Sequence, residues 1–313
     1  MSKAAPSSGR LFLLLKEAAS MFEAAGVARP RWTADQLLSR RLGCKPIELY
    51  LEPERFSVIT RSDSGEAISF QADVAARANG VPLQYLMGSA EFYGREFLVG
   101  PGVFIPRPET EVLVSVTLEL LEGTASRGRG VSGSPSKSNR VVVDVGTGSG
   151  AIAVTLALEH PGIRVIATDL SSNALAFARR NAARLGAAVS FLQENLIESL
   201  KPMSADLIVA NLPYLDSADS SSWPRELHWD PWLALDGGEG GLSLIHRLIH
   251  QAGPVLKPEG KLVLEIGMGQ AEWVQRSAEN IGFELDQIVP DLAGVHRVVV
   301  FRMSSLRESP WRN

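Results

Sequence analysis

A short polar and aromatic stretch, Asn211-Leu212-Pro213-Tyr214, follows an apolar run at residues 206–210 that is typical of a buried strand. The asparagine offers an amide that can accept a hydrogen bond, the proline stiffens the loop, and the tyrosine supplies a π-face. At the end of a buried strand, this combination can hold a planar nitrogen group between hydrogen-bond acceptors and a ring. The stretch therefore predicts a binding site for a planar amide or amine.

A second candidate site is the glycine turn Gly146-Thr147-Gly148-Ser149-Gly150, which lies between an apolar strand pattern and an apolar helix pattern. Glycine is needed there because the chain must turn sharply into a helix while its backbone comes close to a ligand. The first turn of the following helix presents free N–H groups, which favour phosphate or other polar ligands. The turn therefore predicts a nucleotide-type ligand.

The position of Asp169 narrows the choice of ligand. Asp169 follows Gly150 by 19 residues and ends the next strand pattern, where a carboxylate can accept hydrogen bonds from both hydroxyls of a ribose. NAD would fit the same arrangement, although the dinucleotide fingerprint has its third glycine one position later, at Ala151, where alanine is sometimes allowed. The stretch at residues 211–214 has no evident use in hydride transfer and a direct one in methylating nitrogen. We therefore expect S-adenosylmethionine as the cofactor.

Alternating strand and helix patterns must position these groups. They predict an α/β fold with a mainly parallel sheet. The expected strands are residues 140–145, 164–169, 189–193, 206–210 and 261–266, with a closing antiparallel pair at 283–289 and 297–302. The expected helices between them are residues 151–159, 172–185 and 242–256.

The first third of the chain has a different organisation. Residues 11–80 read as helices, with Thr33 as the N-cap of a helix over 34–42 that Gly43 ends, and a further helix over 66–78. Aromatic and β-branched residues punctuated by glycine predict a β-hairpin between residues 81 and 103. Residues 123–139, rich in glycine and serine, predict a flexible surface loop. We expect a helical domain at 1–80, a hairpin linker at 81–105 and a catalytic domain at 106–313.

Composition excludes several classes of protein. The 313 residues are 45% hydrophobic and carry a formal net charge of −4, which indicates a globular interior and argues against direct nucleic-acid binding. The single cysteine, Cys44, excludes an internal disulfide framework and a multi-cysteine zinc site. No apolar run approaches the roughly 20 residues of a membrane span. We expect a monomer in the cytoplasm, without a membrane partner, and leave an organelle open.

The chain resembles the HemK/PrmC family, S-adenosylmethionine-dependent methyltransferases that modify the glutamine of the Gly-Gly-Gln motif in peptide chain release factors. The most diagnostic segment is Phe104-Ile-Pro-Arg-Pro-Glu-Thr-Glu111, which alone reads only as a rigid helix start. Further matching segments are Pro82-Leu-Gln-Tyr85, Asp144-Val-Gly-Thr-Gly-Ser-Gly150, Ala234-Leu-Asp-Gly-Gly238, Leu264-Glu-Ile-Gly267 and residues 291–297. The resemblance implies a class I, Rossmann-like methyltransferase with a seven-stranded sheet and an N-terminal helical domain that docks the release factor.

The resemblance also implies roles for individual residues. Those implied to bind the cofactor are Gly146, Thr147, Gly148, Ser149, Gly150, Asp169, Asn195, Leu196 and Asn211, with Leu196 packed beside the adenine. Those implied to bind the target glutamine are Asn211, Leu212, Pro213 and Tyr214. Two positions depart from the family pattern: Leu212 replaces the first proline of Asn-Pro-Pro-Tyr, and Asn195 replaces an acid. Leucine keeps the backbone carbonyl, and asparagine can still accept a hydrogen bond.

A carboxamide nitrogen is a poor nucleophile because its lone pair is delocalised into the carbonyl group. We expect the Asn211 side-chain oxygen and the Leu212 carbonyl to accept the two N–H bonds of the target amide and aim its lone pair at the methyl group. Tyr214 would cover the amide plane, and Pro213 would stiffen the loop. The expected catalytic residues are therefore Asn211, Pro213 and Tyr214, with no strong general base.

Other interpretations stay open at the level of the sequence. Leu212 motivates an alternative activity, adenine-N6 methylation of RNA or DNA, and a third reading is a non-catalytic adenosine-binding module. His246 and His250 have the spacing of a zinc-binding pair without a third ligand, so a structural role is favoured. Glu265 reads equally well as a structural residue or as a neighbour of the site. Three tryptophans are expected to pack a substrate-side loop: Trp223, Trp229 and Trp232.

Overall fold

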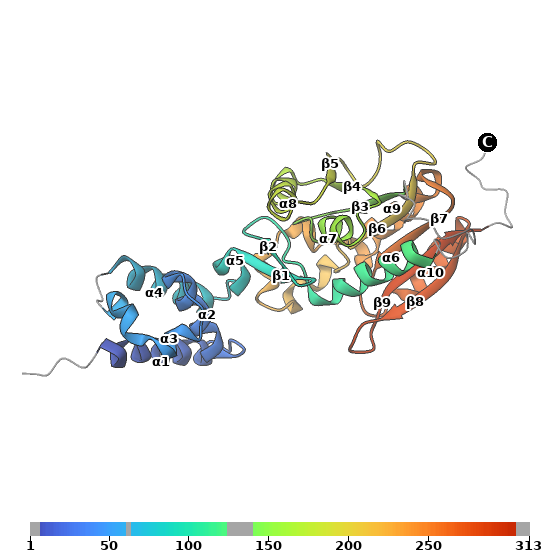
Figure 1. The fold of residues 1–313 in the computed structure, drawn as a ribbon. Coiled ribbons are helices and arrows are strands. Elements are labelled where there is room, and N and C mark those ends of the chain that lie inside the picture. Colours follow the sequence, from blue (N-terminus) through green and yellow to red (C-terminus); the bar gives the residue numbers. More distant parts are fainter. Residues whose placement is uncertain (1–6, 61–63, 124–139, 305–313) are drawn as a thin grey trace, which may run out of the picture. The chain divides into compact units, whose positions relative to one another are not determined.

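The structure is a computed structural model that describes residues 7–60, 64–123 and 140–304. The chain forms two compact units (Figure 1). Unit 1 comprises Met1–Ser89 together with Pro224–Trp229, and unit 2 comprises Ala90–Trp223 and Asp230–Asn313. The first boundary falls within the segment 81–105 that the sequence analysis assigns to the linker. The expected surface loop over 123–139 lies outside the described residues, except for Gly123.

Unit 1 is helical. Its elements are α1 (Ser7–Ala24), α2 (Pro30–Leu42), α3 (Glu48–Leu51), the 3₁₀ segments η1 (Pro53–Thr60) and η4 (Leu227–Trp229), α4 (Gly65–Ala78) and α5 (Leu83–Met87). Ser64 caps α4 by accepting a hydrogen bond from the Ala67 N–H. The core contains apolar side chains spaced along one face of each longer helix, among them Leu11, Leu15, Phe22, Leu37, Leu38, Phe70 and Val74.

Two local predictions for this region are wrong. Thr33 is not the N-cap of α2: the helix begins at Pro30, whose ring fixes a helical φ, and the buried Thr33 hydroxyl donates to the Ala28 carbonyl. The predicted hairpin is also too long, because residues 83–87 form the helix α5, which Gly88 ends in the left-handed conformation.

The actual hairpin is shorter and belongs mainly to unit 2. It pairs β1 (Ser89–Phe92) with β2 (Arg95–Leu98) in a two-stranded sheet. Tyr93 and Gly94 form its turn with φ values of 51° and 68°, as a two-residue type I′ turn requires.

Unit 2 is built on a seven-stranded sheet in the order β5-β4-β3-β6-β7-β9-β8. Its strands are β3 (Val141–Val145), β4 (Arg164–Asp169), β5 (Val189–Gln193), β6 (Ala205–Ala210), β7 (Leu256–Glu265), β8 (Phe283–Pro290) and β9 (His296–Met303). The strands β3 to β7 pair with one another in parallel, and β9 is antiparallel to β7 and β8. This confirms the α/β class, the seven strands and the closing antiparallel pair.

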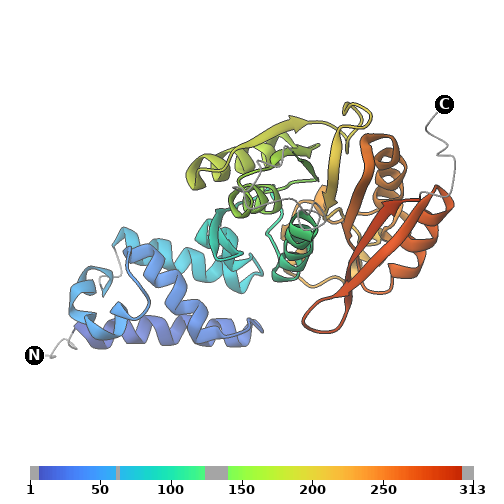
Figure 2. The same cartoon turned by 45° about the vertical axis from the view of Figure 1, so that its right-hand side comes forward.

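Helices cover both faces of this sheet (Figures 1 and 2). They are α6 (Glu111–Gly123), α7 (Ala151–Glu159), α8 (Ser172–Leu185), α9 (Ser243–Val255) and α10 (Ala271–Asn280), with the 3₁₀ segments η2 (Pro108–Thr110), η3 (Ser217–Ser222), η5 (Trp232–Ala234) and η6 (Glu239–Gly241). Val143 packs in a core with α9 and α10, whereas its neighbour Val142 packs in a second core with α6, α7 and α8. A strand buried on both faces explains the uninterrupted apolar run of β3.

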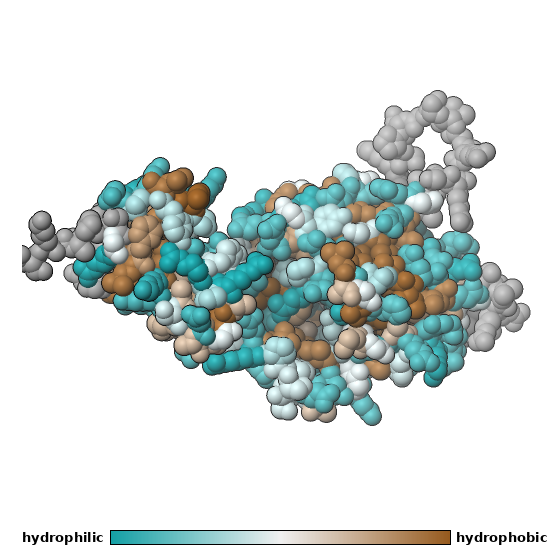
Figure 3. Space-filling view, turned by 90° about the horizontal axis from the view of Figure 1, so that it is seen from below, coloured by the Kyte–Doolittle hydropathy of each residue, from teal (hydrophilic) through white to brown (hydrophobic). Residues whose placement is uncertain are grey.

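The outer surface is mixed. On the face seen in Figure 3, apolar residues gather over part of the larger unit between polar margins. Met268 and Leu292 are among the exposed large apolar side chains of unit 2. Among the helices of the described residues, none is long and apolar enough to cross a membrane.

Candidate active site

The register of the parallel strands brings the candidate groups to one edge of the sheet. Val145 of β3 pairs with Thr168 of β4 and with Ala210 of β6. The glycine turn, Asp169 and Asn211 therefore follow neighbouring strands at the same level. After β3 the chain continues to β4, and after β6 it continues to β7, so the two connections lead away from each other in the sheet. Ligands of open α/β sheets bind in the crevice at such a point, outside the carboxyl ends of the strands.

The glycine turn adopts a conformation that favours glycine at three places. Gly146, Gly148 and Gly150 have φ values of 71°, 57° and 81°, in the left-handed region. A Cβ on Gly150 would lie 3.0 Å from Ala178 Cβ, so this glycine also allows α7 to pack closely on α8. The Gly148 N–H donates to Asp169 Oδ2 at 2.8 Å, which ties the turn to the end of β4.

Asp169 keeps spare acceptor capacity. Its Oδ1 accepts from the Ser171 N–H at 2.8 Å, and each carboxylate oxygen has a second lone pair for a ligand hydroxyl. Burial raises the pKa of Asp169, and the backbone N–H groups of Ser171, Gly148 and Leu170 oppose that rise. The residues present thus fit a ribose held beside the glycine turn.

The role of Asp144 was missed at the level of the sequence. Thr147 Oγ1 donates to its Oδ2 at 2.6 Å, and the Ala153 N–H donates at 3.2 Å, so this carboxyl joins the turn to α7. The side chain is fully buried, and burial raises its pKa to about 7. An acid inside the apolar run of residues 141–145 was the available signal, since buried acids usually serve a site.

The loop after β5 carries the two residues expected beside the adenine. Asn195 Nδ2 donates to Glu198 Oε1 at 2.9 Å, which leaves its Oδ1 as an acceptor. Leu196 is buried and has a φ of 57°, which is costly for a leucine. Such local strain is common at ligand sites, where the surrounding structure enforces it.

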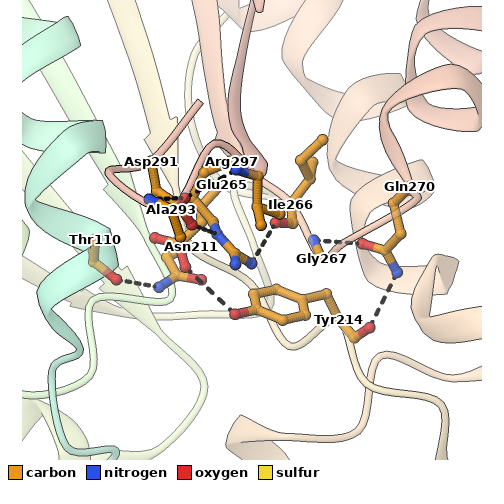
Figure 4. A network of polar contacts seen from close by, with 11 residues as sticks. Thr110, Asn211, Tyr214, Glu265, Ile266, Gly267, Gln270, Asp291, Ala293 and Arg297 are labelled. Atoms are coloured by element: carbon orange, nitrogen blue, oxygen red, sulfur yellow. Dashed lines mark hydrogen bonds and ion pairs between the residues drawn. The ribbon is translucent and has the colours of Figure 1, made fainter. Parts of the chain in front are cut away.

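The stretch after β6 packs directly on the cofactor turn. Leu212 is buried, and one of its methyl groups lies 3.0 Å from the point where a Cβ of Gly146 would be. Asn211 Nδ2 donates to Thr110 Oγ1 at 2.9 Å, and the Tyr214 hydroxyl lies 3.5 Å from Glu265 Oε1 (Figure 4). The expected amide-binding residues and the cofactor turn are therefore neighbours.

Glycines and a glutamine hold the backbone of this stretch. A Cβ on Gly237 would lie 2.6 Å from the Pro213 carbonyl oxygen, and a Cβ on Gly241 would overlap the Tyr214 carbonyl oxygen. Gln270 Nε2 donates to the same Tyr214 carbonyl at 3.0 Å (Figure 4). The segment Ala234-Leu-Asp-Gly-Gly238, matched above only by resemblance, thus supports the site by close backbone contact.

The segment at residues 104–111 links several parts of unit 2. Arg107 forms an ion pair with Asp230, whose side chain is fully buried. Thr110 accepts from Asn211, and Glu111 Oε1 accepts from the Tyr93 N–H at 2.8 Å. The segment is a rigid helix start, and it also contacts the loop that follows β6.

Glu265 ends β7 beside the site, which resolves the open choice about its position. Burial raises its pKa to about 7, while a hydrogen bond from Thr110 and the charge of Arg297 oppose the rise. Arg297 itself donates to Asp291 Oδ2 at 3.1 Å and to the Ile266 carbonyl. Burial also raises the pKa of Tyr214 to about 12, so this phenol stays protonated.

The remaining candidates do not converge on the site. His246 and His250 contact each other at 3.3 Å, and within the described ranges no group of three or more metal-ligating side chains occurs. Trp223 and Trp232 stack with ring centroids 5.4 Å apart, as expected for loop packing. Trp229 belongs to unit 1 and is 46% exposed.

Comparisons with known proteins show which family the chain resembles. A family model described as "Methyltransferase small domain" matches residues 131–223, and one described as "PrmC N-terminal domain" matches residues 14–88. The chain is 39% identical over 282 residues to a "Release factor glutamine methyltransferase" of Koribacter versatilis, covering 90% of this chain and 94% of that protein. It is 40% identical over 255 residues to a protein of the same name from Neisseria gonorrhoeae, covering 80% and 88%.

Proposed function

The chain belongs to the release factor glutamine methyltransferase family, and from that premise we propose that it methylates the side-chain nitrogen of the glutamine in the Gly-Gly-Gln motif of a peptide chain release factor. The observation that supports this proposal is the contact of Leu212 with Gly146, because the loop that we propose to bind the amide then lies beside the turn that we propose to bind the cofactor. We further propose that the protein acts as a monomer in the cytoplasm.

S-adenosylmethionine would supply the electrophilic methyl group. Gly148, Gly150 and Asp169 would hold its adenosine part, with Asn195 and Leu196 beside the adenine. The left-handed glycines and the spare acceptor capacity of Asp169 support this assignment.

The protein's own contribution is positioning. The Asn211 Oδ1 and the Leu212 carbonyl each accept a hydrogen bond from one N–H group of the target amide. These two hydrogen bonds direct the nitrogen lone pair at the methyl group. Tyr214 covers the amide plane and Pro213 stiffens the loop. The nitrogen becomes acidic as the new bond forms, so its proton can pass to a neighbouring carbonyl or to water.

Adenine methylation of nucleic acid would use a similar grip on a planar nitrogen. The names of the relatives do not favour it, and the net charge of −4 offers no general affinity for phosphates.

A labelling assay tests the proposal. The protein is incubated with radiolabelled S-adenosylmethionine and either a release factor or bulk RNA. We expect label on the release factor, and none on a release factor whose motif glutamine is replaced by alanine. Label on RNA alone would reject the proposal.

A further inference from the structure

The amide of Asn211 has two possible orientations that differ in chemistry. Its oxygen and its NH₂ group have nearly the same shape, so packing alone does not decide which of them faces a ligand. The proposed reaction needs the oxygen to face the target amide, because only an acceptor can bind its N–H. Something beside Asn211 must therefore distinguish the two ends.

Thr110 is placed to make this distinction. It is 3% exposed at the end of η2, and its Oγ1 accepts from Asn211 Nδ2 at 2.9 Å (Figure 4). A hydroxyl has one proton and can also accept. Thr110 therefore binds the NH₂ end of Asn211 only while its own proton points elsewhere.

Glu265 provides the place for that proton. Its side chain is 2% exposed, its Oε1 lies 3.5 Å from the Tyr214 hydroxyl, and the nearby Thr110 hydroxyl lowers its pKa. An ionised carboxylate only accepts, and within the part of the chain that the structure describes Glu265 Oε2 is buried without a hydrogen-bond partner. A buried acceptor with unused capacity attracts the hydroxyl proton and leaves the Thr110 lone pair for Asn211.

We propose, building on the function above, that Thr110 and Glu265 are positioning residues that fix the orientation of the Asn211 amide. Glu265 sets the direction of the Thr110 hydroxyl, and Thr110 holds the Asn211 NH₂ group away from the substrate. The oxygen of Asn211 then faces the target amide before the substrate arrives. The two residues stand 155 positions apart in the chain, Thr110 at the end of η2 and Glu265 at the end of β7.

The direction of this hydrogen-bond chain depends on the charge of Glu265. Burial and Glu109 favour the neutral carboxyl, whereas Thr110, Tyr214 and Arg297 favour the charged form, and the resulting pKa is about 7. A neutral Glu265 donates to Thr110, which then donates to Asn211 and turns its NH₂ group toward the substrate. The proposal thus predicts turnover that rises as pH increases through about 7.

Threonine variants test the first link. Thr110→Val keeps the shape and removes the hydroxyl, so we expect kcat to fall at least about tenfold while the dissociation constant for S-adenosylmethionine stays within about twofold. Thr110→Ser restores the hydroxyl and should recover most of kcat. The matched control is Thr117→Val in α6, which removes another buried hydroxyl, bonded to the Leu113 carbonyl, and should leave kcat unchanged. A Thr110→Val enzyme with the kcat of the parent would overturn the proposal.

The carboxyl variant tests the second link. In Glu265→Gln the donor and acceptor roles along the series Glu265, Thr110 and Asn211 are no longer fixed. We therefore expect reduced turnover, and a plot of turnover against pH without the inflection near pH 7. The double variant Thr110→Val with Glu265→Gln should be no slower than the slower single variant, because the two residues act as one unit. Additive losses, or an unchanged pH profile in Glu265→Gln, would contradict the proposal.

A measurement on the free protein separates this inference from the proposed function. In protein labelled with ¹⁵N-asparagine, the Asn211 NH₂ protons should exchange slowly with water in the parent and in Thr110→Ser, and quickly in Thr110→Val. If release factor methylation fails while this pattern holds, the function is wrong and the orientation is right. If methylation holds and the pattern is absent, the orientation is wrong.

Discussion

At the scale of single residues, the side-chain amide of Asn211 lies next to a neutral hydroxyl, that of Thr110, and to a carboxyl, that of Glu265. We propose that Asn211 faces the target amide, with its NH₂ group bonded to Thr110 and with Glu265 next to Thr110. The side chain of Leu212 fills the core beside Gly146, and its backbone carbonyl is the proposed second acceptor for the target amide. Side chain and backbone therefore carry separate roles, and substitutions can test each role independently.

Replacing Asn211 by alanine removes the proposed side-chain acceptor. We expect kcat to fall by about 100-fold or more, with little change in affinity for S-adenosylmethionine, because the lost hydrogen bond orients the nucleophile. Turnover kinetics and calorimetric titration with the cofactor measure the two effects. An equal loss in both quantities would instead assign Asn211 to cofactor binding.

Replacing Leu212 by proline keeps the carbonyl and shortens the buried side chain. We expect kcat within a few-fold of the parent, and a free energy of unfolding lower by about 1–2 kcal/mol from the lost core packing. Denaturant unfolding and turnover kinetics check the pair of outcomes. A collapse of kcat in a stably folded variant would show that the leucine side chain, rather than the carbonyl, serves the reaction.

Asp144 makes stability depend on pH. Its folded pKa of about 7 lies above the ordinary value of 3.8, so the folded protein binds this proton more tightly than the unfolded chain. The associated stability is fully present below about pH 4 and is lost as pH rises to about 7. Asp144→Asn should escape this loss, gaining on the order of a few kcal/mol over the parent at pH 8 and little at pH 4. Parallel stability curves for the two proteins would refute this account.

At the scale of elements, the ends of the strands can be predicted from the sequence. The contacts between elements distant in the chain cannot. Apolar runs predict β3, β4 and β6, and Gly146, Asp169 and Asn211 mark where these runs end, at one edge of the sheet. The link between Thr110 and Glu265 depends on where η2 packs against β7, which no local pattern encodes. The missed helix α5 shows the reverse case, because Pro82 precedes it, Gly88 ends it, and four of the five residues between them are good helix formers.

The glycine-rich segment after η5 allows a sharp test of backbone packing. Gly241→Ala places a methyl group against the Tyr214 carbonyl and should displace the tyrosine, lowering kcat at least about tenfold. The control is Gly240→Ala: its φ of 61° is as strained as the 71° of Gly241, yet the nearest atom to its Cβ lies 3.7 Å away. We expect this control to lose about 1 kcal/mol of stability and little activity.

At the scale of the whole molecule, the two units are not consecutive pieces of chain. The segment Pro224–Trp229 follows the amide-binding loop in sequence but belongs to unit 1. Its Glu226 forms an ion pair with Arg77, whose side chain is only 8% exposed and whose other nitrogen donates to the Val81 carbonyl. A buried guanidinium thus has its charge partner in a distant part of the sequence.

Removing that partner should destabilise unit 1. Glu226→Ala leaves the Arg77 charge buried and uncompensated, and we expect a loss of about 1–3 kcal/mol together with faster proteolysis within residues 224–229. Glu272→Ala is the matched control, since its ion pair with Arg276 is exposed at both ends and should contribute little. Thermal unfolding and limited proteolysis give the readouts. Equal losses in both variants would show that burial of Arg77 is irrelevant.

The interrupted course of unit 1 also limits how this gene can recombine. The chain passes between the units after residues 89, 223 and 229, so a single crossover near residue 89 would exchange most of the helical unit but leave the segment with Glu226 behind. The retained segment with Glu226 would then meet a helical unit other than the one that supplies Arg77. A functional chimera between distant relatives therefore requires two coordinated exchanges, and the helical unit and this short segment are expected to be inherited together.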